Sequence, residues 1–402
     1  MCIVVKKEVM KKEILIIGGG TAGITTAAQI KKTLGEYVAV TIVDPASKHY
    51  YQPQWTLVGG GVIPHEKTQR LMSEVIPKNV TWIQDEVISF EPEQNTVLLK
   101  SSRTLSYDVL IVAAGIQLDW YKIKGAVEAL SFDNVCSNFI PGGSSKTWEV
   151  LNRVQSGNAL FTQPPLPIKC PGAPQKAVYL ADDFFRRKGI RDKVQPIFAN
   201  HGPRIFGVEK YRVSLEKLIS RKEIITMFEH NLVEVRPKEN IAVFEKGDKS
   251  LVEVSYSMIH IVPPMSSPDF IKKSVLANEE GWVDVDKHTL QHKKFSNVFS
   301  LGDCSSLPTS KTGAAIRKQA PVLVANLLSY LKGSELKAKY DGYTSCPLVT
   351  GYGKVIMAEF DYEGHPQETF PFDQSKERWS MWLVKAHLLP MMYWEGMLKG
   401  RA

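Results

Sequence analysis

The sequence lacks several features that would place it in a special class of protein. Its 402 residues contain five cysteines and no CxxC pair, which argues against a disulfide-dense secreted domain, a thioredoxin-type motif and a zinc site. No run approaches about eighteen apolar residues, so we expect no membrane-spanning helix. We find no internal repeat and no low-complexity tract, and the start of the chain has neither a secretory signal's apolar core nor a transit peptide's composition.

What is present indicates ordinary globular domains. The chain is 44% hydrophobic and 23% charged, which allows packed cores, and its length predicts two or three domains. The formal net charge of +8 suits an anionic membrane surface or a nucleic acid and does not choose between them.

The stretch from residue 13 to residue 44 gives the most specific signal. An apolar run precedes Gly18, Gly20 and Gly23, and a helix-like segment follows them. A second apolar run ends at Asp44, 21 residues after Gly23. Glycines at this spacing let the backbone approach a pyrophosphate at a helix N-terminus, and the acid holds the adenosine ribose hydroxyls. The alternative is an α/β crossover with a glycine-rich turn and no ligand.

Two further strands end in small residues. The run SYDVLIVAAG ends at Ala113, Ala114 and Gly115, and the run SNVFSLGD ends at Gly302 and Asp303. Small residues at strand ends permit close approach to a dinucleotide. Taken with the first motif, these strand ends resemble the two-dinucleotide-binding-domain flavoproteins, in which FAD lies across the first domain. The resemblance implies an α/β fold with two Rossmann-like domains, of which the glutathione-reductase-like FAD domain carries the second as an insertion.

The α/β pattern restarts near residue 119, which predicts how these domains divide the chain. We expect the first part of the FAD domain over 11–118, the inserted Rossmann-like domain with Cys170 over 119–284, the second part of the FAD domain over 285–335, and a C-terminal region with Cys346 and membrane-docking helices over 336–402.

The inserted domain lacks the second glycine motif that most members of this superfamily use for a nicotinamide cofactor. At the equivalent place the chain reads PPLPIKCPGAPQK, in which prolines remove backbone donors and stiffen the turn. Cys170 lies here beside Lys169 and just before Gly172 and Pro174, near the expected start of a helix. The positive end of a helix lowers a thiol pKa and favours the thiolate. A buried structural cysteine is the alternative.

Six blocks of the chain resemble one group within this superfamily, the sulfide:quinone oxidoreductases, in the form found in mitochondria and some bacteria. The blocks are HYYQPQWTLVGGG, IKCPGAPQK, GWVDVDKHTLQH, LGDCSSLPTSKT, YDGYTSCPLVTGY and ETFPFDQSKERWSM. The resemblance implies that Cys170 and Cys346 are a redox-active disulfide. Hydrogen sulfide would attack it, leaving a persulfide on Cys346 and a thiolate on Cys170. Two electrons would pass through FAD to ubiquinone or another quinone, and an acceptor such as glutathione or sulfite would take the sulfane sulfur.

The same resemblance implies which residues bind the cofactor. They are Gly18, Gly20, Ala22, Gly23, Asp44, Gln52, Val87, Asp303 and Lys311. It implies no metal site and no nucleic-acid partner. A solvated surface lysine is the alternative for Lys311, and for Cys136 a spectator thiol competes with a role in persulfide relay. Cys304 is expected to be packed, and Arg317 and Lys318 place charges where this family mostly has small apolar residues.

The C-terminal stretch RWSMWLVKAHLLPMMYWEGMLKGRA mixes aromatic and apolar residues with Lys385, Lys399 and Arg401. We expect Pro390 to split it into two short helices that lie in a membrane interface. This predicts a peripheral protein of the mitochondrial inner membrane, on its matrix face, or of a bacterial plasma membrane, on its cytoplasmic face. A core-packing helical hairpin or a homodimer contact is the alternative.

Two rival functions stay open at this point. An NADH:quinone oxidoreductase of the same superfamily would need the second glycine motif, which the chain lacks. An FAD-stabilised interaction protein would use its cysteines only structurally. The sequence does not identify the sulfur acceptor, the quinone or the oligomeric state.

Overall fold

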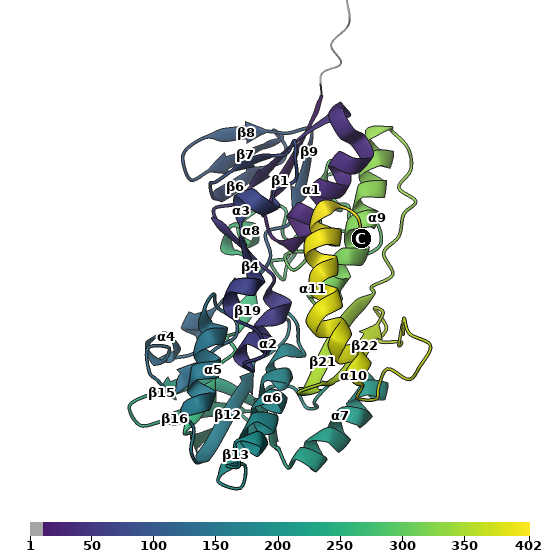
Figure 1. The fold of residues 1–402 in the computed structure, drawn as a ribbon. Coiled ribbons are helices and arrows are strands. Elements are labelled where there is room, and N and C mark those ends of the chain that lie inside the picture. Colours follow the sequence, from purple (N-terminus) through teal and green to yellow (C-terminus); the bar gives the residue numbers. More distant parts are fainter. Residues whose placement is uncertain (1–10) are drawn as a thin grey trace, which may run out of the picture.

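The computed structural model describes residues 11–402, whose first unit is built on a parallel sheet. The sheet runs in the order β20 (Val298–Ser300), β9 (Val109–Val112), β1 (Lys12–Ile17), β2 (Val38–Val43) and β5 (Thr81–Ile83). The apolar residues of β1 and β9 are buried, as expected for central strands covered on both faces. Helix α1 (Thr21–Leu34) follows the glycine turn and packs beside α9 (Gly313–Leu331) (Figure 1).

Shorter elements complete this unit between β2 and β9. They are β3 (Lys48–Tyr50) paired with β4 (Gln69–Leu71), α3 (Met72–Val75), and the antiparallel sheet of β6 (Val87–Glu91), β7 (Thr96–Leu99) and β8 (Thr104–Ser106). Helix α2 (Trp55–Gly59), from the same stretch of chain, packs against the inserted unit. Val87 is the first residue of β6 and is buried in the core of the unit.

The inserted unit has a second parallel sheet, below the first unit in Figure 1. The sheet order is β11 (Val135–Cys136), β18 (Met258–His260), β12 (Gly157–Gln163), β13 (Val194–Asn200) and β14 (Ile225–Phe228). Its helices are α4 (Ala126–Ala129), α5 (Gly143–Arg153), α6 (Ala173–Arg187) and α7 (Glu209–Lys222). An antiparallel sheet is added by β15 (His230–Arg236), β16 (Ile241–Lys246) and β17 (Leu251–Ser255).

The chain passes between the two units through a pair of short strands. β10 (Gln117–Leu118) pairs antiparallel with β19 (Met265–Ser266). Directly afterwards, Ile271 of α8 (Asp269–Lys272) packs in the core of the first unit, together with Leu276. The expected boundary at residue 284 assigned this stretch to the inserted unit, whereas its apolar side chains are buried against the first.

A hairpin of β21 (Thr344–Gly351) and β22 (Lys354–Phe360) follows α9 and packs against α6. After it, a helical run covers residues 379–399, with α10 (Trp379–Leu383) and α11 (Leu389–Met391) joined by a π-helical turn over Val384–Leu388. Figure 1 shows this yellow run extending from the hairpin to α1.

Pro390 does not split the C-terminal run as the sequence had predicted. It lies in the first turn after the π-helical turn, a position where the missing N–H of proline is tolerated. A second π-helical turn over Met392–Gly396 and a 3₁₀ turn over Met397–Lys399 continue the same run. Among the helices of residues 11–402, none combines the length and apolar composition needed to cross a bilayer.

The turn of the hairpin is fixed to the far end of α6. Tyr352 N donates to Asp183 Oδ2 at 2.9 Å, and Asp183 is also in contact with the Lys222 ammonium group. Gly351 has no room for a side chain, because a Cβ there would overlap the Asp183 carboxylate. The hairpin and α6 are therefore held together at a point remote from Cys346.

We predict that Gly351→Ala lowers the melting temperature of the protein. Overpacking of this kind costs about 1–3 kcal/mol, which corresponds to several degrees in a chain of this size. The matched control is Gly207→Ala, because a Cβ at Gly207 meets nothing within 4 Å. Thermal unfolding followed by circular dichroism measures both, and equal melting temperatures would contradict the tight contact at Gly351.

Candidate functional site

A cavity of about 590 Å³ lies between the two units and is lined by both. Its wall includes the glycine turn after β1, the end of β9, the start of α9, the segment before α6, the β21–β22 hairpin and the C-terminal helical run. Eight of the predicted residues line it: Gly18, Gly20, Ala22, Asp44, Gln52, Cys170, Asp303 and Lys311. Gly23, Val87 and Cys346 do not.

The glycine turn leaves backbone exposed to this cavity. Gly18 has a φ of +105°, and a Cβ on it would come within 2.8 Å of the Ala113 carbonyl carbon. A Cβ on Gly23 would overlap the Gly18 carbonyl group, so glycine at this position allows the turn to form although Gly23 does not line the cavity. No side chain caps the N-terminus of α1. The free N–H groups and the helix dipole therefore favour the pyrophosphate of a dinucleotide.

Asp44 follows β2 and stands at the same edge of the cavity. Its carboxylate accepts hydrogen bonds from Gly19 N at 2.6 Å and Ala46 N at 2.8 Å, while burial raises the pKa of the carboxyl group. Each oxygen keeps a lone pair for a further donor. This position and chemistry fit the adenosine ribose of FAD.

The opposite end of the cavity carries buried charge. Lys311 is only 8% exposed and its ammonium group lies 3.9 Å from the centroid of the Trp282 ring, so it is not a solvated surface lysine. Burial lowers the pKa of Lys311 and raises the pKa of Asp303. Lys169 donates to Gln52 Oε1 at 2.7 Å, and burial lowers its pKa to about 8. The cationic groups here fit the electron-rich end of a flavin.

The structure brings together the two cysteines that the sequence separates by 176 positions. Cys170 Sγ lies 4.0 Å from Cys346 Sγ. Cys170 lines the cavity, whereas Cys346 is 3% exposed and sits behind it on β21. A Cβ on Gly172 would overlap the Cys346 sulfur, so glycine at this position is what allows the approach.

Cys170 is held in a strained conformation directly before α6. Its φ of +50° lies in the left-handed region, which costs of order 1–3 kcal/mol for a residue other than glycine. Its N–H donates to Lys311 O at 2.8 Å, which ties the sulfur to the segment that precedes α9. Strain retained at a nucleophilic side chain indicates a functional position.

Two buried lysines flank the sulfur pair, and sequence reasoning had assigned neither to it. Lys176 Nζ lies 3.3 Å from Cys170 Sγ and 3.9 Å from Cys346 Sγ. Lys385 comes from the first π-helical turn and donates to Pro53 O at 2.8 Å. Burial lowers the pKa of Lys385 to about 7. Lys176 lies in the first turn of α6, where a positive charge is unfavourable next to the positive end of the helix dipole. This unusual placement is the signal from which the sequence could have indicated a role for Lys176.

These contacts give the two thiols opposite properties. A hydrogen bond from Cys346, together with the positive charges of Lys176 and Lys385, holds the pKa of Cys170 well below its usual range. The same hydrogen bond raises the pKa of Cys346. In the reduced pair, Cys170 is therefore the thiolate and Cys346 the thiol.

The other described cysteines lie outside the site. Cys136 is fully buried in the inserted unit, where burial raises its pKa to about 12. Cys304 is fully buried and its sulfur contacts Val112 O at 3.5 Å. Neither lines the cavity, as expected for a spectator thiol and a packed one.

A second lobe of the cavity lies on the other face of the hairpin. Side chains alternate along a strand, so Ser345 and Pro347 point away from the face of Cys346. They line this lobe together with the cross-strand residues Met357 and Glu359. Phe370, Val384 and Leu388 add apolar wall, and Arg317 lies at the same end.

The C-terminal run closes the cavity over the glycine turn. Tyr393 Oη lies 2.9 Å from Thr21 Oγ1 and 2.5 Å from His49 Nε2, while His49 Nδ1 donates to Gly19 O at 3.0 Å. Burial lowers the pKa of His49 to about 4, so the imidazole is neutral at pH 7. The C-terminal segment is thus a wall of the cofactor cavity as well as a surface element.

Comparisons with known proteins agree with this geometry. A family model described as pyridine nucleotide-disulphide oxidoreductase matches residues 12–155. The chain is 48% identical to the mitochondrial sulfide:quinone oxidoreductase of Mus musculus, over 96% of this chain and 86% of that protein. The Dictyostelium discoideum protein of the same name is 47% identical, over 97% and 86%. The crystal structure of the Aquifex aeolicus sulfide:quinone oxidoreductase has the same fold, with a TM-score of 0.84 at 20% identity, covering 97% of this chain and 92% of that one.

We predict that Cys170 in the reduced protein is alkylated at pH values where an ordinary thiol is protonated. Its reactivity should be lost only as the pH falls through the lowered pKa, whereas Cys136 should stay unreactive. Lys176→Met should move the midpoint for Cys170 to higher pH because a stabilising cation is removed. The control is Lys217→Met, on the exposed face of α7.

The measurement is the rate of iodoacetamide labelling against pH, followed peptide by peptide with mass spectrometry. A midpoint that Lys176→Met leaves in place would show that the Cys170 thiolate does not depend on this ammonium group.

Proposed function

The chain belongs to the sulfide:quinone oxidoreductase family, and we propose that its oxidation of sulfide takes place at Cys170 and Cys346. The observation that carries this proposal is the pair of sulfurs 4.0 Å apart, of which one lines a dinucleotide cavity. The cofactor is FAD, and the substrates are hydrogen sulfide and a quinone.

In the oxidised state the two cysteines form a disulfide. Hydrosulfide attacks the Cys346 sulfur, the S–S bond breaks, and Cys170 leaves as the thiolate, so that Cys346 carries a persulfide. The lowered pKa of Cys170 makes it the better leaving group of the two. The ammonium group of Lys176 stabilises the negative charge that develops on this sulfur.

The outer sulfur of the persulfide then passes to a nucleophilic acceptor such as glutathione or sulfite, and the disulfide re-forms as two electrons leave the pair. FAD supplies the two-electron chemistry that connects the sulfur pair to the quinone. Gly18, Gly20, Ala22 and Asp44 would hold its pyrophosphate and ribose, and Gln52, Asp303 and Lys311 would lie at its flavin end. Gly23 would support the turn, whereas Val87, expected on the adenine side, lies in the core of the first unit and does not line the cavity.

The inserted unit offers little to a nicotinamide cofactor, which weighs against an NADH:quinone oxidoreductase. A Cβ on Gly172 would meet not only the Cys346 sulfur but also Leu348 Cδ2, at 2.6 Å. The space before α6, where a second pyrophosphate would lie, is thus filled by the hairpin. A structural role also fits Cys170 poorly, because its pKa is lowered, whereas burial raises the pKa of the structural thiol Cys136.

The second lobe is the place we assign to the quinone. Pro347, Met357, Phe370 and Val384 give it apolar walls, and the hairpin separates it from the sulfur pair. Leu388 lines the lobe and is 47% exposed, so the lobe adjoins the apolar outer side of the C-terminal run, where a hydrophobic substrate would arrive.

We also propose that the C-terminal run docks on a membrane, on the mitochondrial inner membrane or on a bacterial plasma membrane. Trp379, Leu383, Leu388 and Met391 are exposed on it, a concentration of apolar surface that marks an interaction site. The π-helical turn lies between Leu383 and Leu388. Its wider spacing keeps the exposed residues before and after it on the same side of the run.

We predict that Cys170→Ser and Cys346→Ser each abolish sulfide-dependent quinone reduction while FAD stays bound. Without either sulfur the disulfide cannot form, so no electrons leave the sulfide. Cys136→Ser is the control and should keep turnover. The measurements are flavin absorbance after addition of sulfide and quinol formation. Normal turnover in either serine variant would exclude the disulfide mechanism, and bleaching by NADH alone would support the rival oxidoreductase.

We predict that the double variant Trp379→Glu/Met391→Glu binds vesicles at least about tenfold more weakly, because two apolar side chains together contribute several kcal/mol on burial. Neither residue lines the cavity, so electron transfer to a water-soluble quinone should persist. Val127→Glu, at an equally exposed apolar residue of α4, is the control. Co-sedimentation with vesicles containing anionic lipid measures binding, and equal binding of both variants would contradict docking through the C-terminal run.

A further inference from the structure

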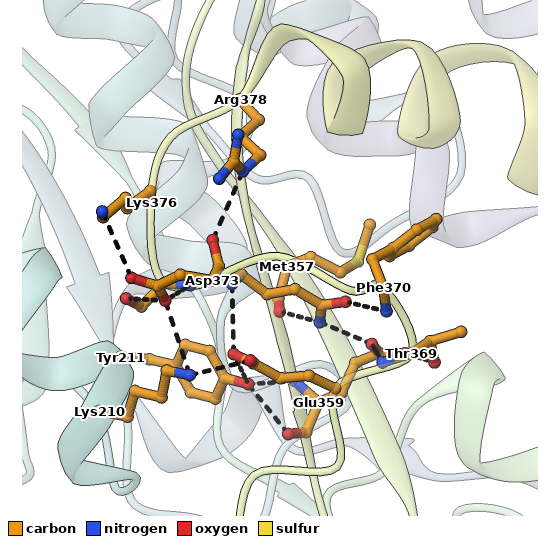
Figure 2. Close-up of polar contacts among 12 residues, drawn as sticks. Lys210, Tyr211, Met357, Glu359, Thr369, Phe370, Asp373, Lys376 and Arg378 are labelled. Carbon is orange, nitrogen blue, oxygen red and sulfur yellow. Dashed lines mark hydrogen bonds and ion pairs between the residues drawn. The ribbon is translucent and has the colours of Figure 1, made fainter.

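A buried carboxylate lies in the wall of the second lobe. Glu359 of β22 is 4% exposed and lines the cavity. Its carboxylate accepts hydrogen bonds from Thr369 N at 2.9 Å, Thr369 Oγ1 at 3.0 Å, Gln374 Nε2 at 2.7 Å and the Tyr343 hydroxyl. Figure 2 shows Glu359 with Thr369 beside it and Tyr211 on its other side. Nothing in the sulfur chemistry uses this carboxylate.

The two hydroxyl groups that meet on Glu359 Oε1 face different surroundings. Both residues line the cavity, but Thr369 is exposed to solvent, whereas Tyr343 is only 7% exposed. One oxygen of Glu359 therefore connects the hydroxyl of an exposed residue, Thr369, to the hydroxyl of a buried one, Tyr343. This is the arrangement that a proton needs in order to pass from solvent to a buried hydroxyl group in the cavity wall.

The position of Glu359 on the hairpin places its carboxylate in the lobe that we assign to the quinone. Glu359 lies opposite Ser345 across the hairpin, while the neighbouring pair is Cys346 and Ala358. The alternation of the strands thus puts Glu359 on the lobe face and the sulfur on the other. Proton delivery through Glu359 would not disturb the thiolate of Cys170.

We propose that Tyr343 and Glu359 form a proton relay from Thr369 to the quinone, an inference that rests on the proposed function. The quinone takes up two electrons and two protons to become the quinol. One proton accompanies the two electrons from the reduced cofactor, and the second comes from solvent. As Tyr343 gives its proton to the quinone oxygen, the Thr369 hydroxyl passes a proton from water to the Glu359 carboxylate, and Glu359 passes a proton on to Tyr343. No residue of the relay changes its charge over the cycle.

Other charged and titratable groups surround the relay. They are Arg317 and Lys318 of α9, Lys210 and Tyr211 of α7, and Glu368 of the loop after β22. Tyr211 matters most for the test, because its hydroxyl donates to the backbone oxygen of Glu359 at 3.1 Å and not to its carboxylate. It anchors the same residue without belonging to the relay.

The test follows quinone-dependent reoxidation of the holoenzyme after its flavin has been reduced with dithionite, so that the sulfur pair is bypassed. Tyr343→Phe and Glu359→Gln should slow reoxidation at saturating quinone by about 100-fold, at the lower end of the ~10²–10⁴-fold effect of general acid catalysis. Tyr211→Phe should react close to the wild-type rate. The solvent deuterium isotope effect of the wild type should fall in Tyr343→Phe as direct protonation by water takes over.

A separate equilibrium measurement distinguishes a role of Tyr343 in proton transfer from a purely structural role. Binding of a quinone analogue that cannot be reduced, followed by tryptophan fluorescence, should be unchanged in Tyr343→Phe. If Tyr343→Phe binds the analogue more weakly but is reoxidised at the normal rate at saturating quinone, Tyr343 is only a contact in the cavity wall and the relay is overturned. Equal reoxidation rates for Tyr211→Phe and Tyr343→Phe would also overturn it. Where the buried variants fail to fold, Thr369→Val should slow reoxidation and Thr369→Ser should not, and equal rates for these two would overturn the proposal.

Failure of the relay and failure of the proposed function are distinguishable. A wild-type protein that sulfide does not reduce, but that quinone reoxidises, would contradict the sulfide chemistry and still test the relay.

Discussion

The packing of the β21–β22 hairpin against α6 is the contact on which the rest of the site depends. It carries Cys346 to the N-terminus of a helix that begins just after Cys170, and Gly172 leaves the space that the sulfur occupies. From residue 172 to residue 183 the helix rises about 16 Å, and from residue 346 to residue 351 the strand advances about the same distance. The Asp183 contact at the far end therefore matches the sulfur contact at the near end, and a slip of one residue would turn Cys346 to the other face.

The hairpin also divides the chemistry. One face carries the sulfur and meets Cys170, Lys176 and Lys385, where cationic groups support a thiolate. The other face lines an apolar lobe in which Glu359 is surrounded by donors. Sulfide oxidation needs an anion-stabilising environment and quinone reduction needs an apolar one with a proton source. The two strands of the hairpin separate these two environments, and both faces of the hairpin adjoin one cofactor cavity.

The C-terminal run connects the cavity to the surface. Its inner side supplies Lys385 to the sulfur pair and Tyr393 to the glycine turn, and its outer side exposes apolar residues such as Trp379 and Met391. At residues 384–388 the run changes from α-helical to π-helical hydrogen bonding, and this segment carries Lys385. Such turns occur frequently at functional sites. The proposed membrane-docking surface and the wall of the cofactor cavity thus belong to one element.

The sequence by itself determined the dinucleotide turn, the two α/β units and the two important cysteines, because these depend on local spacing and on motifs that a resemblance can carry. It did not determine that Pro390 lies inside a continuous run, that residues 269–284 pack with the first unit, or that Lys176, Lys385 and Glu359 face the cavity. Each of these depends on contacts between segments distant along the chain. The sequence predicted a thiolate at Cys170 from the helix that follows it, but only the tertiary structure supplied Cys346, Lys176 and Lys385 as the groups that lower its pKa. Hydrogen bonding, burial and neighbouring charge, which set a pKa, belong to the folded site and to no single segment.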